Sequence, residues 1–140
     1  MCMIAGAICN DGNLMRPYLV DHTENASGAL VEQNKPASYK QIMSKDQAAF
    51  LQNLMAAVVS DGTGAKLSDQ SYEAFGKTGT AQVSDSTDDS TDQTNAWFVG
   101  YGKKDGYNDL AIAVVVEDSG AGSTYAVPVA KKVFDKYFNE

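Results

Sequence analysis

The chain has 140 residues, of which 44% are hydrophobic and 21% charged, so we expect one domain with a single hydrophobic core. Its formal net charge of −7 argues against binding to nucleic acid, because phosphates would be repelled, and against an electrostatic membrane anchor. No apolar run approaches the roughly 20 residues that cross a bilayer, and the first residues lack the basic segment and cleavage site of a signal peptide.

The first nine residues are mostly apolar and predict a helix. Gly12 follows it and suits the left-handed residue that often ends a helix. The predicted buried face carries Met3, Ile4, Ala7 and Ile8.

Cys2 and Cys9 lie on this same predicted helix. A separation of seven residues places them about 10 Å apart along the helix axis, which is too far for a disulfide. We therefore expect two free, buried and unreactive thiols, which do not indicate a redox compartment.

Residues 14–20 contain Pro17 and predict extended chain, either at a sheet edge or unpaired. Residues 21–40 are polar apart from a short apolar patch, so we interpret them as a surface excursion with at most a weak hairpin. His22, the only histidine, falls in this excursion. It has no second histidine or cysteine beside it, so we expect a surface position and no metal.

The strongest helix signal begins at Ser44, where Ser44 and Gln47 match the pattern of a capping box. Apolar residues then recur at spacings of three and four until a Gly-rich stop at residues 61–64. The predicted buried face consists of Phe50, Leu51, Leu54, Met55, Val58 and Val59.

Three segments then predict consecutive strands: Tyr72–Val83, Ala96–Tyr101 and Leu110–Glu117. Residues 84–95 between the first two are almost wholly polar, and residues 103–109 predict a tight turn. The third strand is apolar at nearly every position, so we expect both of its faces to be covered.

A terminal helix is predicted to cover the sheet, and the helix of residues 44–60 can contribute to the same layer. Pro128 suits only its first turn, because proline lacks the N–H that an interior position needs. The result is an α+β fold in which an antiparallel three-stranded meander packs against helices. The predicted apolar side of the terminal helix carries Val129, Val133, Phe134, Tyr137 and Phe138.

The most informative motif is Lys77-Thr78-Gly79-Thr80, on the first of the three strands. Its ammonium can attract a carboxylate, and its glycine lets another backbone approach. Strand alternation puts the two hydroxyls on one face and Lys77 on the other, unless twist or a bulge turns the lysine towards a cleft. An edge strand of this kind can bind an extended peptide and place an amide N–H against an oxyanion.

The motif continues as Ala-Gln and is followed by the segment NAWFVGY at residues 95–101 and by an apolar strand that ends at Glu117. With residues 12–20 and 58–64 upstream, this order closely resembles the C-terminal half of penicillin-binding protein transpeptidase domains, in their monofunctional, class B-like form. The resemblance covers nearly the whole chain. It implies a partial β-lactamase/transpeptidase-like fold.

The resemblance also implies roles for the motif strand beside an active-site cleft. Lys77 and Thr80 would be catalytic, and the substrate-binding set would be Lys77, Thr78, Gly79, Thr80 and Gln82. The threonines would bond the substrate carboxylate, and the Thr80 N–H would form half of an oxyanion hole. The implied reaction needs no cofactor: a D-alanyl-D-alanine stem peptide acylates a serine and then an amine, which cross-links peptidoglycan, and β-lactams mimic the peptide.

The other two motifs of that family are missing. No serine is followed by lysine three positions later, and no Ser-x-Asn occurs. We therefore expect residues 1–140 to be a C-terminal fragment that is inactive alone, from a membrane-anchored parent on the extracytoplasmic side. Its expected partners are stem peptides and β-lactams through the complete domain, the remainder of that domain, and a second copy through exposed apolar surface.

Three alternatives remain open: a β-lactam sensor or other non-catalytic penicillin-binding module, a serine β-lactamase fragment, and an unrelated acidic α+β interaction domain. The Gly-Thr-Ala-Gln continuation and the pair Trp97-Phe98 favour the transpeptidase over the β-lactamase. An acidic cluster in the polar loop lacks the alternating ligands and glycine of a calcium loop, so we expect a solvated hairpin tip. The resemblance implies that this loop lies beside the cleft. The cluster comprises Asp85, Asp88, Asp89 and Asp92.

Overall fold

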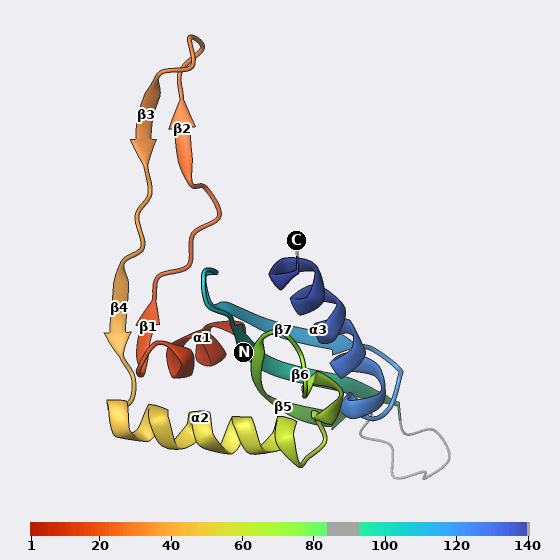
Figure 1. Ribbon diagram of the computed structural model, residues 1–140. Helices are drawn as coiled ribbons and strands as arrows, with labels where there is room; N and C mark the ends of the chain where they lie inside the picture. The colour runs from red at the N-terminus through yellow and green to blue at the C-terminus, as the bar shows by residue number, and fades with distance from the viewer. Residues whose placement is uncertain (84–92, 140) are drawn as a thin grey trace.

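The computed structural model of the chain describes residues 1–83 and 93–139. Three antiparallel strands form the central sheet, β5 (Glu73–Gln82), β6 (Thr94–Lys103) and β7 (Leu110–Val116), in the spatial order β5-β6-β7 (Figure 1). The predicted meander and the α+β class are thus confirmed. The aspartate cluster at positions 85–92 lies outside the described residues.

The helix α3 (Gly122–Phe138) covers one face of the sheet. Phe134 and Phe138 are fully buried there, as predicted, and pack with Phe98 of β6. The prediction is wrong for the rest of this face, because the side of α3 that contacts the sheet carries small residues. Its other fully buried hydrophobic side chains are Ala126, Val127 and Ala130, whereas Val129, Val133 and Tyr137 are 41%, 41% and 37% exposed.

Pro128 lies inside α3 rather than in its first turn, which corrects the prediction. A proline at this position leaves the carbonyl of Thr124 without its usual helical partner. Thr124 is exposed, so water can bond that carbonyl and the helix continues.

Two helices cover part of the opposite face, α1 (Cys2–Cys9) and α2 (Lys45–Ser60). Their core centres on Tyr101, whose ring stacks on Phe75 with centroids 4.7 Å apart and packs with Ile8 and Met55. By strand alternation this face is the one opposite α3. The expectation that α2 adds to the α3 layer is therefore wrong, except at its end, where Val59 reaches the core beneath α3.

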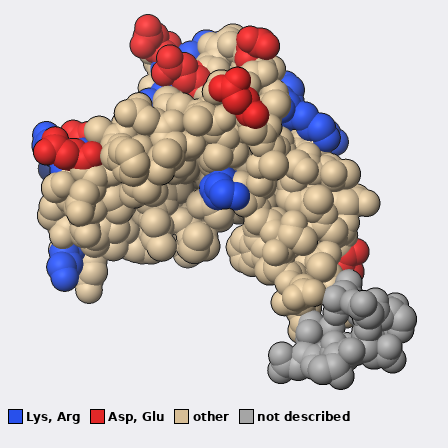
Figure 2. All heavy atoms as spheres, turned by 90° about the horizontal axis from the view of Figure 1, so that it is seen from below, with Lys and Arg blue, Asp and Glu red and all other residues tan. Residues whose placement is uncertain are grey.

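The capping box of α2 is confirmed, since the Gln47 N–H donates to Ser44 Oγ at 3.2 Å and the Ser44 N–H donates to Gln47 Oε1 at 2.9 Å. Its buried stripe is narrower than predicted: Met55 and Val59 are buried, but Phe50 and Leu54 are 63% and 50% exposed. These two side chains point away from the sheet. Figure 2, seen from below, shows the outer side of α2 within a face that carries few charged side chains.

Helix α1 follows the prediction at Ala7 and Ile8, which are buried together with Ala5. The prediction is wrong for Met3 and Ile4, which are 43% and 45% exposed because the helix rests on the sheet through its alanine side. Gly12 is left-handed as predicted, with a φ of 84° and its N–H donating to the carbonyl of Ala7, but the left-handed residue directly after the Asn10 cap is Asp11, with a φ of 53°.

The expected surface excursion is a two-part hairpin arm that projects from the body (Figure 1). Near the body β1 (Asn13–Met15) pairs with β4 (Ser38–Gln41), and farther out β2 (His22–Glu24) pairs with β3 (Leu30–Gln33). Every residue of β2, β3 and β4 is exposed. His22 lies on the surface, as predicted, where its hydrogen bond to Asp21 raises the pKa of the imidazole.

The two cysteines are free, as predicted, but neither is fully buried and Cys2 is exposed. Cys9 is half-buried and its thiol donates to Asp109 Oδ2 at 3.3 Å. Burial raises the pKa of the Cys9 thiol to about 12, with the hydrogen bond to Asp109 acting in the same direction. This thiol is therefore protonated and unreactive at neutral pH.

The third strand is covered on only one face, which corrects the expectation of cover on both. Val114 is buried beneath α3, whereas Ala113 and Val115 on the opposite face are exposed. The reason is that α1 reaches only the Ala111 end of β7, where Ala111 packs in the core around Tyr101.

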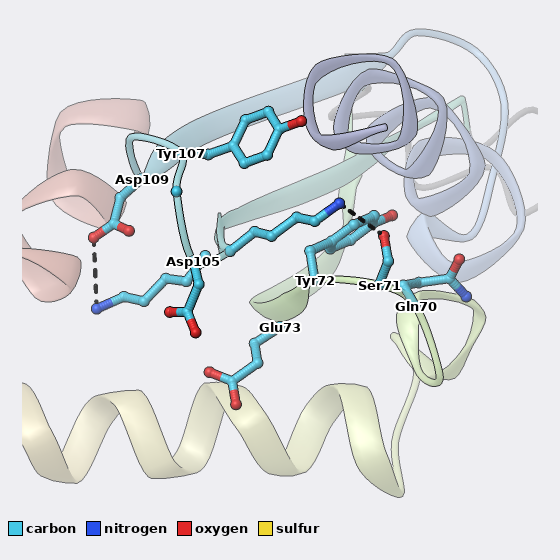
Figure 3. Close-up of a pocket in the computed structure, with 10 residues that line it drawn as sticks. Gln70, Ser71, Tyr72, Glu73, Asp105, Tyr107 and Asp109 are labelled. Carbon is cyan, nitrogen blue, oxygen red and sulfur yellow. Dashed lines mark hydrogen bonds and ion pairs between the residues drawn. The ribbon is translucent and has the colours of Figure 1, made fainter. Parts of the chain in front are cut away.

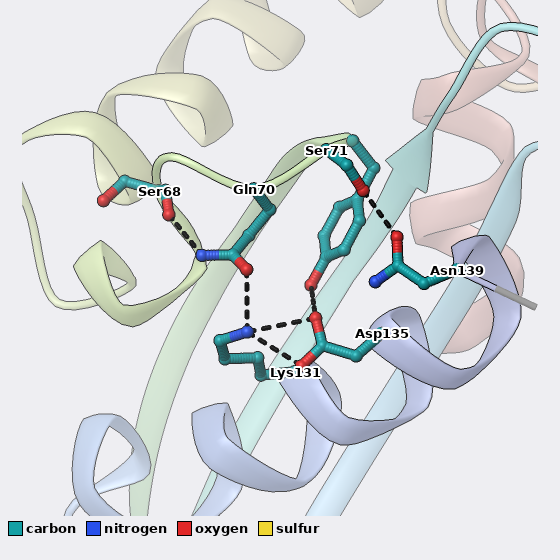
Figure 4. Close-up of polar contacts among 7 residues, drawn as sticks. Ser68, Gln70, Ser71, Lys131, Asp135 and Asn139 are labelled. Atoms are coloured by element: carbon teal, nitrogen blue, oxygen red, sulfur yellow. Dashed lines mark hydrogen bonds and ion pairs between the residues drawn. The ribbon is translucent and has the colours of Figure 1, made fainter.

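A polar network fastens α3 to the segment that leads into β5 (Figure 4). Lys131 Nζ lies 2.8 Å from Asp135 Oδ2 and donates to Gln70 Oε1 at 2.7 Å. The hydroxyl of Tyr72, whose ring is buried, donates to Asp135 Oδ1 at 2.8 Å. These bonds from Lys131 and Tyr72 lower the pKa of the Asp135 carboxyl.

The substitution Asp135→Asn should therefore destabilise the chain at neutral pH by about 0.5–1 kcal/mol, a modest value because the carboxylate is partly exposed. A lowered pKa in the folded state contributes stability above the pKa of the unfolded chain and loses it as the pH falls through the folded value. The loss of stability relative to wild type, measured by urea unfolding, should be smaller near pH 3 than at pH 7, because part of the stabilisation is lost between the pKa of the unfolded chain and the lower pKa of the folded carboxyl. Asp105→Asn, at an exposed carboxylate, is the control and should leave the urea midpoint unchanged at both pH values. An equal loss of stability for Asp135→Asn at both pH values would contradict the prediction.

Candidate substrate-binding strand

All five predicted site residues lie on β5, which is an edge strand of the described sheet. The side chains of Lys77, Thr80 and Gln82 are exposed, and Thr78 and Gly79 are half-buried. The register against β6 is regular, with Thr78 opposite Phe98 and no bulge. The motif therefore presents one continuous strand with an open flank.

The main-chain groups of Thr78 and Thr80 face this open edge. The carbonyl of Phe75 lies against Gly100 of β6, so the Phe75 backbone is directed into the ladder. Successive residues of a strand direct their N–H and C=O groups to alternate edges, which turns those of Thr78 and Thr80 outward. The ammonium of Lys77 donates to the Thr78 carbonyl at 2.7 Å, in agreement with that direction.

The stem of Lys77 lies on the face opposite Thr78, as alternation predicts, and no bulge is needed to bring its ammonium to the edge. Lys77, Gly79 and the half-buried Trp97 border a cavity of about 310 Å³, completed by Met1, Thr78 and Val99. Trp97 thus lies beneath the binding strand, whereas Phe98 belongs to the core. Within the described residues Lys77 forms no ion pair, so its charge is available to an anionic group.

Thr63 is a candidate site residue that the sequence analysis did not identify. It lies in the turn after α2, and its hydroxyl is 2.6 Å from that of Thr78. The turn is tight, since a Cβ on Gly62 would lie 2.8 Å from the carbonyl of Val58. The available sequence signal is the Gly-Thr-Gly stop, which predicts the end of the helix and forms part of the resemblance at residues 58–64, but neither pattern indicates a role for Thr63 itself.

A larger hollow of about 700 Å³ lies at the other end of β5 and β6 (Figure 3). Its lysines are already engaged in the fold: Lys103 Nζ lies 3.6 Å from Asp109 Oδ2, and Lys104 donates to the carbonyl of Phe138 at the end of α3. A cation there complements the negative end of the helix dipole. The Lys104 bond therefore fastens the end of α3 beside this hollow.

Across residues 1–83 and 93–139, no group of three or more His, Cys, Asp or Glu side chains could hold a metal ion. The same residues contain no helix long and apolar enough to cross a membrane. The described site thus offers a cation, hydroxyls and outward main-chain groups.

Comparison with known proteins gives the site its context. The sequence matches the family described as "Penicillin binding protein transpeptidase domain" over residues 1–135. It is 32% identical to peptidoglycan D,D-transpeptidase MrdA of Haemophilus influenzae over 95% of this chain, and 31% identical to peptidoglycan D,D-transpeptidase PbpA of Mycolicibacterium smegmatis over 91%. The chain spans only 22% and 26% of the lengths of these two relatives.

The solved structures agree with this assignment and confirm the expected partial fold. The crystal structure of PBPA from Mycobacterium tuberculosis superimposes with a TM-score of 0.82 at 27% identity, and the match covers 98% of this chain and 31% of that one. The imipenem acyl-enzyme complex of penicillin-binding protein A from the same organism gives 0.80 at 27% identity, over 96% of this chain and 29% of the other. Because the family model matches almost the whole length of this chain, the chain belongs to the penicillin-binding protein transpeptidase family.

Proposed function

We propose that this chain supplies the substrate-binding strand of a serine-type D,D-transpeptidase that cross-links peptidoglycan stem peptides and is acylated by β-lactams. The observation that carries the proposal is the open edge of β5, where outward main-chain groups of Thr78 and Thr80 lie beside the ammonium of Lys77. Two similar proteins are named peptidoglycan D,D-transpeptidases, and a similar structure is an imipenem acyl-enzyme.

In this proposal an extended acyl donor pairs with the open edge of β5, main chain to main chain. Its carboxylate binds the ammonium of Lys77 and the hydroxyls of Thr78 and Thr80. As a serine attacks the donor carbonyl, negative charge develops on its oxygen, and the outward N–H of Thr80 stabilises that charge. Gly79 and Gln82 complete the binding strand.

The nucleophile must come from outside this chain, because no serine here is followed by lysine at the third position. We propose that it belongs to the remainder of the same transpeptidase domain, of which residues 1–140 form a C-terminal portion. That remainder would complete the cavity beside Lys77, Gly79 and Trp97. We further propose that the complete protein is membrane-anchored and acts on the extracytoplasmic side.

Labelling with a fluorescent penicillin tests this function. The complete gene product should become covalently labelled, whereas the 140-residue chain should not, because it lacks the serine. Lys77→Ala in the complete protein should slow labelling by roughly a hundredfold, since a positive charge near the reacting oxygen is lost. Lys35→Ala, at an exposed lysine on the arm, is the matched control and should label at the wild-type rate.

Two outcomes would contradict the proposal. Penicillin bound by the complete protein without a covalent bond would indicate a non-catalytic binding module, which the missing nucleophile motif also allows. A labelling rate unaffected by Lys77→Ala would show that β5 does not contact the acyl donor.

A further inference from the structure

We propose that Thr63 is a positioning residue of the substrate-binding strand: its hydroxyl donates to Thr78 Oγ1 and thereby directs the Thr78 O–H to the carboxylate of the acyl donor. This inference rests on the proposed function, in which that carboxylate binds the β5 strand. The observation that carries it is the contact between the two hydroxyls, whose oxygens lie 2.6 Å apart although the residues are 15 positions apart in the chain. This distance is at the short end of the range for a hydrogen bond between hydroxyls.

The donor and acceptor roles of the two hydroxyls are fixed once a carboxylate is bound. A threonine hydroxyl has one proton to donate and two lone pairs that accept, whereas an ionised carboxylate can only accept. Thr78 must therefore donate its proton to the carboxylate, so the proton in its contact with Thr63 has to come from Thr63. A hydroxyl that accepts one hydrogen bond also becomes a stronger donor of the next, so the Thr63 contact strengthens the bond to the carboxylate.

The turn that carries Thr63 is held at both ends. Val59 before it is 6% exposed and Leu67 after it is 1% exposed, and both belong to the core beneath α3. Between them the Gly64 N–H donates at 2.9 Å to a carbonyl in the last turn of α2, and a Cβ on Gly64 would lie 3.1 Å from the same oxygen. A fixed backbone therefore presents the Thr63 hydroxyl to β5, and little conformational entropy is lost when it forms its bond.

Acylation of the complete protein by a fluorescent penicillin, measured over a range of penicillin concentrations, tests the role of Thr63. Thr63→Val removes the hydroxyl at nearly constant shape. The dissociation constant of the noncovalent complex should rise about threefold to tenfold, the effect of losing one hydrogen bond between neutral groups. The first-order rate of acylation at saturation should stay within about twofold of wild type, because the carboxylate is bound equally before and during the attack.

Three further variants complete the test, and the thermal midpoint of each shows whether it is folded. Thr63→Ser returns the hydroxyl and should restore the wild-type dissociation constant. Thr23→Val makes the same change at an exposed threonine on the arm and should leave this constant unchanged. The double variant of Thr63→Val with Thr78→Val should bind penicillin no more weakly than Thr78→Val alone, because Thr63 acts through Thr78.

The possible outcomes separate this inference from the proposed function. Complete wild-type protein that is not covalently labelled would overturn both. If the wild type is labelled, an unchanged dissociation constant for Thr63→Val would overturn the role of Thr63 alone. A lower first-order rate with an unchanged dissociation constant, or additive effects of the two valine substitutions, would also overturn it, since Thr63 would then act on the strand as a whole rather than through the hydroxyl of Thr78.

Discussion

Replacing Gly76 by alanine is expected to destabilise the chain strongly, by roughly 1–3 kcal/mol or more. A Cβ at this position would lie 2.5 Å from Cε2 of the Phe98 ring and 3.1 Å from the carbonyl oxygen of Val99. The ring is fully buried and is also confined by Gly100, where a Cβ would lie 2.8 Å from it. Phe98 therefore cannot move aside, and the strand that carries the motif would shift instead.

Gly79→Ala on the same strand is the matched control. There the nearest neighbour of a new Cβ is the Cβ of Trp97 at 3.4 Å, an ordinary contact, so the stability should change little. Urea unfolding of both variants at neutral pH measures the difference directly. Equal urea midpoints for Gly76→Ala and wild type would show that the Phe98 ring can move aside, which its packing in the structure does not allow.

Thr80→Pro in the complete protein is expected to slow acylation by a fluorescent penicillin about 10²–10³-fold, the usual effect of removing one oxyanion donor. The substitution removes the N–H that faces the open edge of β5. It should leave the ladder to β6 intact, because the Thr80 main chain points away from β6. The second-order rate constant of acylation and the thermal midpoint should be measured together.

Thr80→Val separates the amide from the hydroxyl. It keeps the N–H and the strand propensity and loses only the side-chain oxygen, so its acylation should fall less than that of the proline variant. If the two substitutions slow acylation equally, the amide is not the oxyanion donor. If Thr80→Pro acylates at the wild-type rate, the Thr80 N–H does not act in the reaction.

The sequence alone determined the features that depend on neighbours along the chain. The capping box at Ser44 and Gln47, the left-handed end at Gly12 and the order of three strands follow from local hydrogen bonding and side-chain periodicity. The motif at residues 77–80 was found in the same way, because its four residues occupy one strand. Alternation then sufficed to place Lys77 and Thr78 on opposite faces.

Only the tertiary structure decided which apolar side chains are covered and which distant residues meet. Phe50 fits the periodicity of a buried helix face and Val115 lies in a continuous apolar run, but both remain exposed, since such patterns show that a surface is apolar and do not supply the element that covers it. Pro128 is tolerated inside α3, because the free-energy cost of the missing helical hydrogen bond depends on whether water can reach the carbonyl of Thr124. The contact between Thr63 and Thr78 arises because the turn after α2 is folded against β5, and no pattern within either segment specifies that approach.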